Sequence, residues 1–140
     1  MQAPAKRLLL LCHSGSWDRL LQAGSAAATA AGSGWSVDVV FYFDALDKLM
    51  HDRLDDPAST GAEGAWHAAL REPSGLSSPG VPSELFDYAR SSGRARFLAC
   101  SASCSLLALD EGEVLKRVDH IVGWPTVIEL MGRAQSVLYL

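Results

Sequence analysis

Apolar residues occur along this chain in short continuous runs, separated by segments in which they recur at helical spacing. A short continuous apolar run is typical of a strand that is buried on both faces of a parallel sheet. The runs predict strands over residues 6–12, 35–43, 94–100, 119–122 and 136–140. The helical spacing, bounded by Ser, Asp, Pro or Gly, predicts helices over 17–31, 44–54, 83–92, 101–109 and 125–132, with one more turn over 113–117.

A segment rich in proline and glycine, residues 55–82, interrupts the alternation. Connections of this length inside a domain are usually functional. We expect a surface excursion with a short helix over 61–70. Within it, Trp66 and His67 are expected to anchor the segment rather than to cover an active face.

Strands that alternate with helices indicate an α/β fold, here a three-layer α/β/α sandwich around a five-stranded parallel sheet. We expect one domain over residues 1–140 and the flavodoxin-like strand order 2-1-3-4-5. In that order the first and third strands are neighbours, about 4.8 Å apart. Cys12 and Cys100, which end these two strands, would then meet at the crevice where such folds bind ligands.

Composition and charge exclude several classes of protein. The chain of 140 residues has a formal net charge of −4 and no run of Lys or Arg, which argues against a nucleic-acid partner. No apolar stretch approaches the roughly 20 residues of a membrane span. The apolar run Leu8–Cys12 is too short for a secretory leader, so we expect a cytoplasmic protein. Three cysteines without CxxC spacing are typical of reduced thiols.

The strongest chemical signal is the sequence RFLACSASCSLLAL over residues 96–109. It predicts a strand that ends at Cys100 and a helix that begins just after it. The unpaired N–H groups and the dipole of a helix start stabilise a thiolate, and Ser101 and Ser103 could hydrogen-bond it. Cys104 follows four residues later and is expected on the same helical face. The alternative is that these cysteines only fill the core.

Further candidates lie at the end of the first strand and near the end of the second. Cys12 could form a redox pair with Cys100 or pass a sulfur atom to it, and His13 could stabilise or protonate a thiolate; the alternative for His13 is a solvated turn residue. Asp44 is the nearest carboxylate, with helix capping as its expected role.

The turn HSGS, residues 13–16, is placed like a phosphate-binding loop between a strand and a helix. Ser14 and Ser16 are therefore candidate binding residues, or caps of the helix that follows. The turn lacks both GxGxxG and GxxxxGK[ST], so we expect no cofactor. The remaining histidines show no metal-ligand spacing with the cysteines, and no metal site is expected.

The sequences LLLLCHSGSWDRLLQAGSAAATAAGSGWSVDVVFYFDAL, FLACSASCSLLAL and VDHIVGWPTVIEL together resemble the DsrE/DsrF-like family of small α/β proteins over nearly the full chain. The resemblance implies a flavodoxin-like sandwich, homo- or hetero-oligomeric assembly and, in sulfur-relay members, a cysteine that accepts sulfane sulfur as a persulfide. Cys100 stands where that cysteine is expected. Cys12 and Cys104 depart from the family pattern of a single carrier cysteine.

Three functions remain open from the sequence. The first is a sulfurtransferase-like sulfur relay in which Cys100 exchanges sulfur with a donor or acceptor protein. The second is a non-catalytic, oligomeric binding module of the same fold. The third is a small-molecule or nucleotide binder that uses the same crevice. For all three we expect a homo-oligomer without nucleic-acid or membrane partners.

Overall fold

The computed structural model describes residues 4–56 and 80–140. The strands are β1 (Arg7–Cys12), β2 (Ser36–Phe41), β3 (Ala95–Cys100), β4 (His120–Val122) and β5 (Ser136–Tyr139). The helices are α1 (Trp17–Gly32), α2 (Phe43–Met50), α4 (Pro82–Ser91), α5 (Ser101–Leu106), α6 (Glu111–Val114) and α7 (Trp124–Arg133). The predicted helix over 61–70, with Trp66 and His67, lies outside the described residues.

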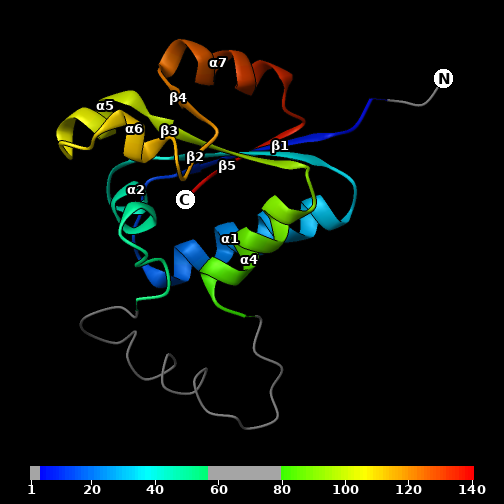
Figure 1. Cartoon of the computed structure of the whole chain (residues 1–140). Coiled ribbons are helices and arrows are strands. Elements are labelled where there is room, and N and C mark those ends of the chain that lie inside the picture. The colour runs from blue at the N-terminus through cyan, green and yellow to red at the C-terminus, as the bar shows by residue number, and fades with distance from the viewer. Residues whose placement is uncertain (1–3, 57–79) are drawn as a thin grey trace, which may run out of the picture.

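The five strands form one sheet in which every neighbouring pair is parallel, which confirms the predicted α/β fold. The sheet is the middle of three layers, with α7 above it and α1 and α4 below it (Figure 1). The order of the strands is β4-β3-β2-β1-β5 and is consistent with a flavodoxin-like sandwich.

This strand order differs from the predicted order 2-1-3-4-5 in one respect that matters for the site. β2, not β1, is the neighbour of β3, and β1 pairs with β2 and β5. From β1 to β4, each new strand is added on the same side of the one before it. Residues of α1, α4, α5 and α6 pack into one apolar cluster. Among the described helices, only α7 packs on the other face, and it returns the chain to β5 beside β1. Right-handed crossovers place helices on both faces of a sheet when the order in which strands are added reverses once, as it does here between β4 and β5.

The core divides into two apolar clusters, one on each face of the sheet. The larger cluster lies between the sheet and α1 and α4 and contains Phe41, Phe86 and Phe97, whose ring centroids are 5.3–5.8 Å apart. At Gly24 of α1, an added Cβ would lie 3.0 Å from the Cβ of Leu85 in α4, so a glycine allows the two helices to approach closely. The smaller cluster lies under α7.

Two helix starts differ from the prediction. α2 begins at Phe43 with Tyr42 as its N-cap, so Asp44 lies in the first turn and is not the cap. α4 has Val81 as its N-cap rather than Ser83. The backbone N–H of Ser83 instead donates to Asp55 Oδ1 at 2.8 Å. In both helices an extended residue, Tyr42 or Val81, is the N-cap, and the expected polar cap lies after it in the first turn.

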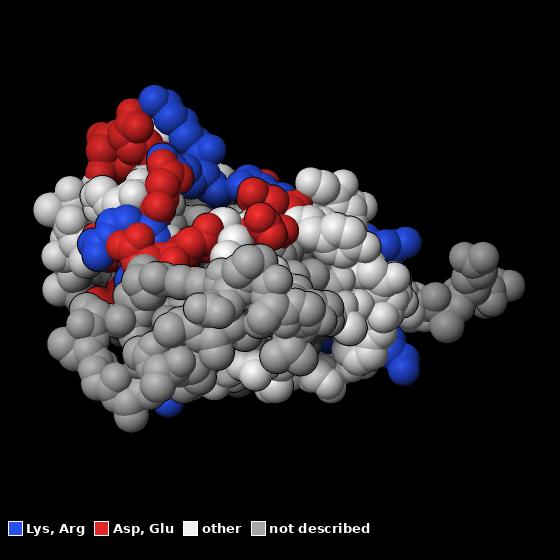
Figure 2. All heavy atoms as spheres, turned by 90° about the horizontal axis from the view of Figure 1, so that it is seen from below, with Lys and Arg blue, Asp and Glu red and all other residues white. Residues whose placement is uncertain are grey.

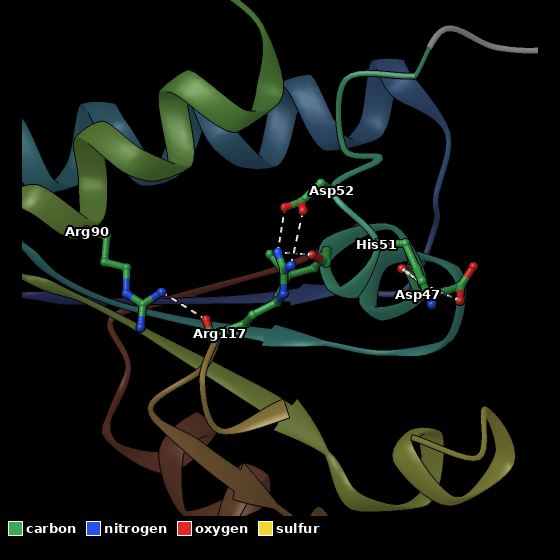
Figure 3. Close-up of polar contacts among 6 residues, drawn as sticks. Asp47, His51, Asp52, Arg90 and Arg117 are labelled. Atoms are coloured by element: carbon green, nitrogen blue, oxygen red, sulfur yellow. Dashed lines mark hydrogen bonds and ion pairs between the residues drawn. The ribbon is translucent and has the colours of Figure 1, made fainter. Parts of the chain in front are cut away.

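A polar network joins α2, α4 and the segment before β4 (Figure 3). Arg117 donates from Nη2 to Asp52 Oδ2 at 3.0 Å and from Nη1 to the carbonyl oxygen of Leu49 at 3.3 Å. Arg90 donates from Nη1 to the carbonyl oxygen of Arg117 at 2.8 Å. Seen from below, acidic and basic side chains lie next to one another along one margin of the molecule (Figure 2). Arg90 and Arg117 therefore link α2, α4 and the segment before β4.

None of the helices in residues 4–56 and 80–140 combines the length and apolar character that crossing a membrane requires.

Candidate functional site

The carboxyl ends of the parallel strands meet at one edge of the sheet, where folds of this kind bind ligands. Cys12 ends β1, Cys100 ends β3, and Tyr139 ends β5. Tyr42 follows directly after β2, and His13 follows directly after β1. Because side chains alternate between the two faces of a sheet, these five residues do not all face the same side.

Cys100 is the residue at which β3 ends and α5 begins, as the sequence predicts. It is the N-cap of α5, with extended backbone angles of φ −68° and ψ 124°. Its side chain belongs to the cluster beneath α7, together with Tyr42 and Val127, and it is 5% exposed. The thiol therefore packs among mainly apolar side chains at the carboxyl edge of the sheet.

Tyr42 adds a second polar group to the cluster that contains Cys100. Its side chain is buried, and among the described residues its hydroxyl has no hydrogen-bond partner. Burial, with smaller contributions from the charges that Cys100 and Tyr139 acquire on ionising, raises the pKa of Tyr42 to about 12. The hydroxyl consequently stays protonated at neutral pH and is able to donate. A buried donor without an acceptor costs about 1–3 kcal/mol, and most buried polar groups in native proteins are hydrogen-bonded.

Trp124 packs against Tyr42 at the outside of this cluster. It is the first residue of α7, and its ring centroid lies 5.8 Å from that of Tyr42. The indole is about half-exposed, at 48%. The part of the site around Cys100 therefore consists of a thiol, a phenol hydroxyl and an indole ring.

His13 lies on the β1–β5 side of the same edge. Its Nδ1 is 2.8 Å from the carbonyl oxygen of Leu140, and its ring centroid is 4.7 Å from that of Tyr139. Because a carbonyl oxygen only accepts, Nδ1 carries the proton in this contact. His13 is thereby fixed by the carboxyl-terminal strand and has a structural partner that the sequence analysis did not anticipate.

Cys12 does not meet Cys100, so the predicted pair is wrong. The backbone register aligns Cys12 with Phe41 and Phe41 with Ala99, which puts β2 between the two cysteine strands. Two strand spacings amount to about 9–10 Å, beyond the Cα separation that a disulfide spans. Cys12 also faces the opposite cluster, where it is 1% exposed, and burial raises its pKa to about 12.

Cys104 also faces away from the Cys100 side. It packs in the cluster that contains Cys12, so the expectation that it shares a helical face with Cys100 is wrong. The reason is that Cys100 belongs to the strand and caps the helix, whereas Cys104 lies inside it. Burial raises the pKa of Cys104, and the neighbouring charges of Cys100 and Glu111 raise it further.

The candidate serines mainly hold loops. The Oγ atoms of Ser14 and Ser16 are 3.0 Å apart, and the backbone N–H of Ser16 donates to Ser14 Oγ at 3.2 Å. Ser16 is the N-cap of α1, but its side chain makes no capping hydrogen bond. Ser103 is fully buried, and its Oγ accepts the backbone N–H of Phe43 at 3.0 Å. Ser101 is exposed.

The turn after β1 is packed closely against the start of α2. A Cβ added at Gly15 would lie 2.8 Å from the Cβ of Asp44, so only glycine fits there without movement. Asp44 itself is exposed and lies beside the turn, not beside Cys100. Phe43, which precedes it, has a positive φ of 41° and is 49% exposed. The turn is therefore held closely against the start of α2.

Within the part of the chain that the structure describes, no group of three or more His, Cys, Asp or Glu side chains is arranged to hold a metal ion.

Sequence reasoning missed Tyr42, Trp124 and Tyr139, because the two tyrosines were counted only as apolar residues of strands and Trp124 lies between a predicted strand and a predicted helix. A usable signal exists for Tyr42. It directly follows a buried strand, as His13 does, and so lies at the ligand-binding edge of a parallel sheet.

Comparison with known proteins gives a fold but no family. No protein-family model matches the chain, and no curated protein matches it. Among solved structures, the chain is similar to MTH1491 from Methanobacterium thermoautotrophicum, described as a protein of unknown function. The two share 16% sequence identity with a TM-score of 0.60, over 97% of this chain and 100% of the other. At this identity the likeness shows a shared fold.

Proposed function

We propose that this protein is a cytoplasmic sulfur carrier of the sulfur-relay type, in which Cys100 holds sulfane sulfur as a persulfide. The observation that carries the proposal is the position of the Cys100 thiol beside the buried, unpartnered hydroxyl of Tyr42. The resemblance of the sequence around Cys100 to DsrE/DsrF-like proteins supports it. The partners would be a persulfide donor and a thiol acceptor.

The transfer step needs no cofactor or oxidant. The Cys100 thiolate attacks the outer sulfur of a donor persulfide, and a bond forms between Cys100 Sγ and that sulfur. The donor's sulfur–sulfur bond breaks, and its electron pair leaves with the inner sulfur as a thiolate. The proton that Cys100 loses is taken up by the donor thiolate or by solvent. Atoms and charge balance, and the sulfane sulfur keeps its oxidation state.

Tyr42 would act on the sulfur that carries the negative charge. Because the raised pKa keeps its hydroxyl protonated, it is able to donate a hydrogen bond to the thiolate or to the outer sulfur of the persulfide. A hydrogen bond to a charged acceptor is worth about 1.5–3 kcal/mol. The donor that has no partner in the sulfur-free protein would then find one in the loaded protein.

Cys100→Ser is expected to abolish persulfide loading, because no other thiol belongs to the cluster beneath α7. The measurement is intact-protein mass spectrometry after incubation with a low-molecular-weight persulfide. The wild type should gain one sulfur atom per chain. Cys12→Ser and Cys104→Ser are the matched controls and should load as the wild type does, since both thiols are buried in the opposite cluster. Loading that persists in Cys100→Ser would refute the proposal.

Tyr42→Phe separates a functional role of the hydroxyl from a structural one. Removing a buried hydroxyl without a partner should leave the free energy of unfolding unchanged or raise it by about 1 kcal/mol. The rate of persulfide loading should fall about tenfold, as expected for the loss of a charge-assisted hydrogen bond. Stopped samples analysed by mass give the rate, and urea unfolding gives the stability. An unchanged loading rate would remove Tyr42 from the mechanism.

A non-catalytic oligomeric module is the alternative that a specific observation favours. Large apolar side chains are exposed on β5 and α7, among them Ile128, Met131, Val137, Leu138 and Tyr139. In the described sheet β5 pairs only with β1, so its outer backbone edge is open to a strand of a second copy. We propose homo-oligomerisation through this surface. If assembly were the whole function, a variant with all three cysteines replaced by alanine would keep its assembly and wild-type Cys100 would take up no sulfur.

A further inference from the structure

Four arginines gather at the amino-terminal edge of the sheet, opposite the edge that carries Cys100. Arg7 begins β1, Arg94 and Arg96 flank the start of β3, and Arg133 ends α7. All four line one pocket of about 430 Å³, together with Ser36 and Asp38. In the sequence these arginines are scattered, and only the parallel arrangement of the strands brings them together.

The pocket carries a strong local excess of positive charge. Four guanidinium groups and one carboxylate give a net charge of +3 there, whereas the whole chain has a formal net charge of −4. Like charges so close together repel, and a globular protein gains nothing in stability from such a cluster. A bound anion would remove this repulsion.

A buried carboxylate fixes the geometry of the cluster. Asp38 on β2 is directly opposite Arg96 on β3 and accepts a hydrogen bond from Arg96 Nε at 2.8 Å. Arg7 Nη1 lies 4.0 Å from the other carboxylate oxygen. The side chain of Asp38 is 8% exposed, while those of Arg96 and Arg7 are 46% and 44% exposed. Asp38 therefore holds two arginines by one side and leaves the remainder of each guanidinium accessible to a ligand.

Arg133 and Arg94 complete the rim. The backbone N–H of Gln135 donates to the carbonyl oxygen of Arg7 at 2.9 Å, which places the end of α7 beside the start of β1. In the described part of the chain, no hydrogen bond or ion pair engages the exposed guanidinium of Arg133. Arg94 Nη1 donates to the carbonyl oxygen of Gly34 at 3.1 Å, which steadies its side chain at the rim.

We propose that this pocket binds a compact ligand that carries two linked phosphate groups. Guanidinium groups match phosphate oxygens in paired hydrogen bonds, and a net charge of +3 favours a multivalent anion over a monovalent one. Among the described residues, no aromatic or large apolar side chain lines the pocket, so the lining offers no apolar surface to a base. The diphosphate itself is the recognised group, whether it is free pyrophosphate or part of a larger molecule.

Calorimetric titration at constant ionic strength tests the site. Pyrophosphate is expected to bind saturably, and acetate is not. ADP is expected to bind no more tightly than pyrophosphate, because only its diphosphate is recognised. Saturable binding should persist in Cys100→Ser, since the pocket lies at the other edge of the sheet. Absence of saturable pyrophosphate binding would overturn the proposal, and so would clearly tighter binding of ADP.

Two matched variants distinguish the pocket from the general charge of the protein. Arg133→Gln removes an arginine of the rim and is expected to raise the dissociation constant of pyrophosphate about fivefold or more. Arg19→Gln makes the same change of charge on an exposed residue of the first turn of α1, at the opposite edge, and should change it less than about twofold. Equal effects of the two substitutions would mean non-specific attraction and would refute the site.

Discussion

Raising the pH from 9 to 12 is expected to lower the free energy of unfolding by roughly 3 kcal/mol through Cys12 alone. Burial raises the pKa of this thiol from 9.0 to about 12. Below pH 9 the thiol is protonated in both the folded and the unfolded chain, and its contribution is constant. Above pH 9 it ionises only in the unfolded chain, which is thereby favoured until the pH reaches about 12. Each pKa unit corresponds to about 1.4 kcal/mol.

Urea unfolding at a series of pH values measures this effect, with Cys12→Ala as the control. Alanine is also small and apolar, and it cannot ionise. Other groups that titrate in the same range, such as Tyr42, affect both proteins equally. The difference in stability between wild type and Cys12→Ala should therefore shift toward the variant by several kcal/mol as the pH rises. Parallel curves for the two proteins would show that Cys12 is not buried as described.

Phe41→Ala is expected to lower the free energy of unfolding by about 3–5 kcal/mol, the range measured when a buried phenylalanine is truncated to alanine. Phe41 lies on the central strand β2 and is fully buried. Its ring centroid is 5.6 Å from that of Phe86 in α4 and 5.3 Å from that of Phe97 in β3. The substitution therefore leaves a cavity at the junction of two strands and a helix.

Equilibrium denaturation gives the size of this effect, and Tyr88→Ala is a matched control. Tyr88 is an aromatic residue of α4 that is 59% exposed, so its truncation should change stability by less than about 1 kcal/mol. A loss below about 1.5 kcal/mol in Phe41→Ala would mean that the three rings do not form a rigid centre of the core.

The elements themselves were predictable because each is encoded by local sequence. The run RLLLLC, for example, is apolar enough to be buried on both faces, and the predicted strand over 6–12 corresponds to β1 (Arg7–Cys12). The ends of elements were less predictable. Asp44 was expected to cap α2, but the helix begins one residue earlier, at Phe43, whose positive φ no local pattern announces.

The order of the strands was not predictable, because an apolar run does not specify its neighbour. Placing β1 beside β3 led directly to the expectation that Cys12 and Cys100 meet. In the structure β2 separates them, and the alternation of side chains turns them to opposite faces. The junction at Cys100 was found because a strand end and a helix start are both local features. The neighbouring hydroxyl of Tyr42 depends on the strand order and was missed.

The arginine pocket was missed for a related reason. A run of basic residues is the sequence signal of a positive patch, and Arg7, Arg96 and Arg133 form no run. The reasoning applied to the cysteines, that parallel strands end at a common edge, applies equally to the edge where they begin. It would have brought Arg7 and Arg96 together from the sequence alone.

The pairing of β1 with β5 has a consequence for synthesis of the chain. Leu8 and Ser136 are aligned partners, and the backbone N–H of Leu140 donates to the carbonyl oxygen of Leu11 at 2.8 Å. β2 covers one edge of β1 early, but the other edge of this apolar strand stays open until the residues of β5 have left the ribosome. A nascent chain thus exposes an unpaired Leu-rich edge until β5 is made, and an exposed strand edge favours intermolecular strand pairing. Because α1 packs on a face of the sheet, protection of that edge falls to β5 itself or to a chaperone.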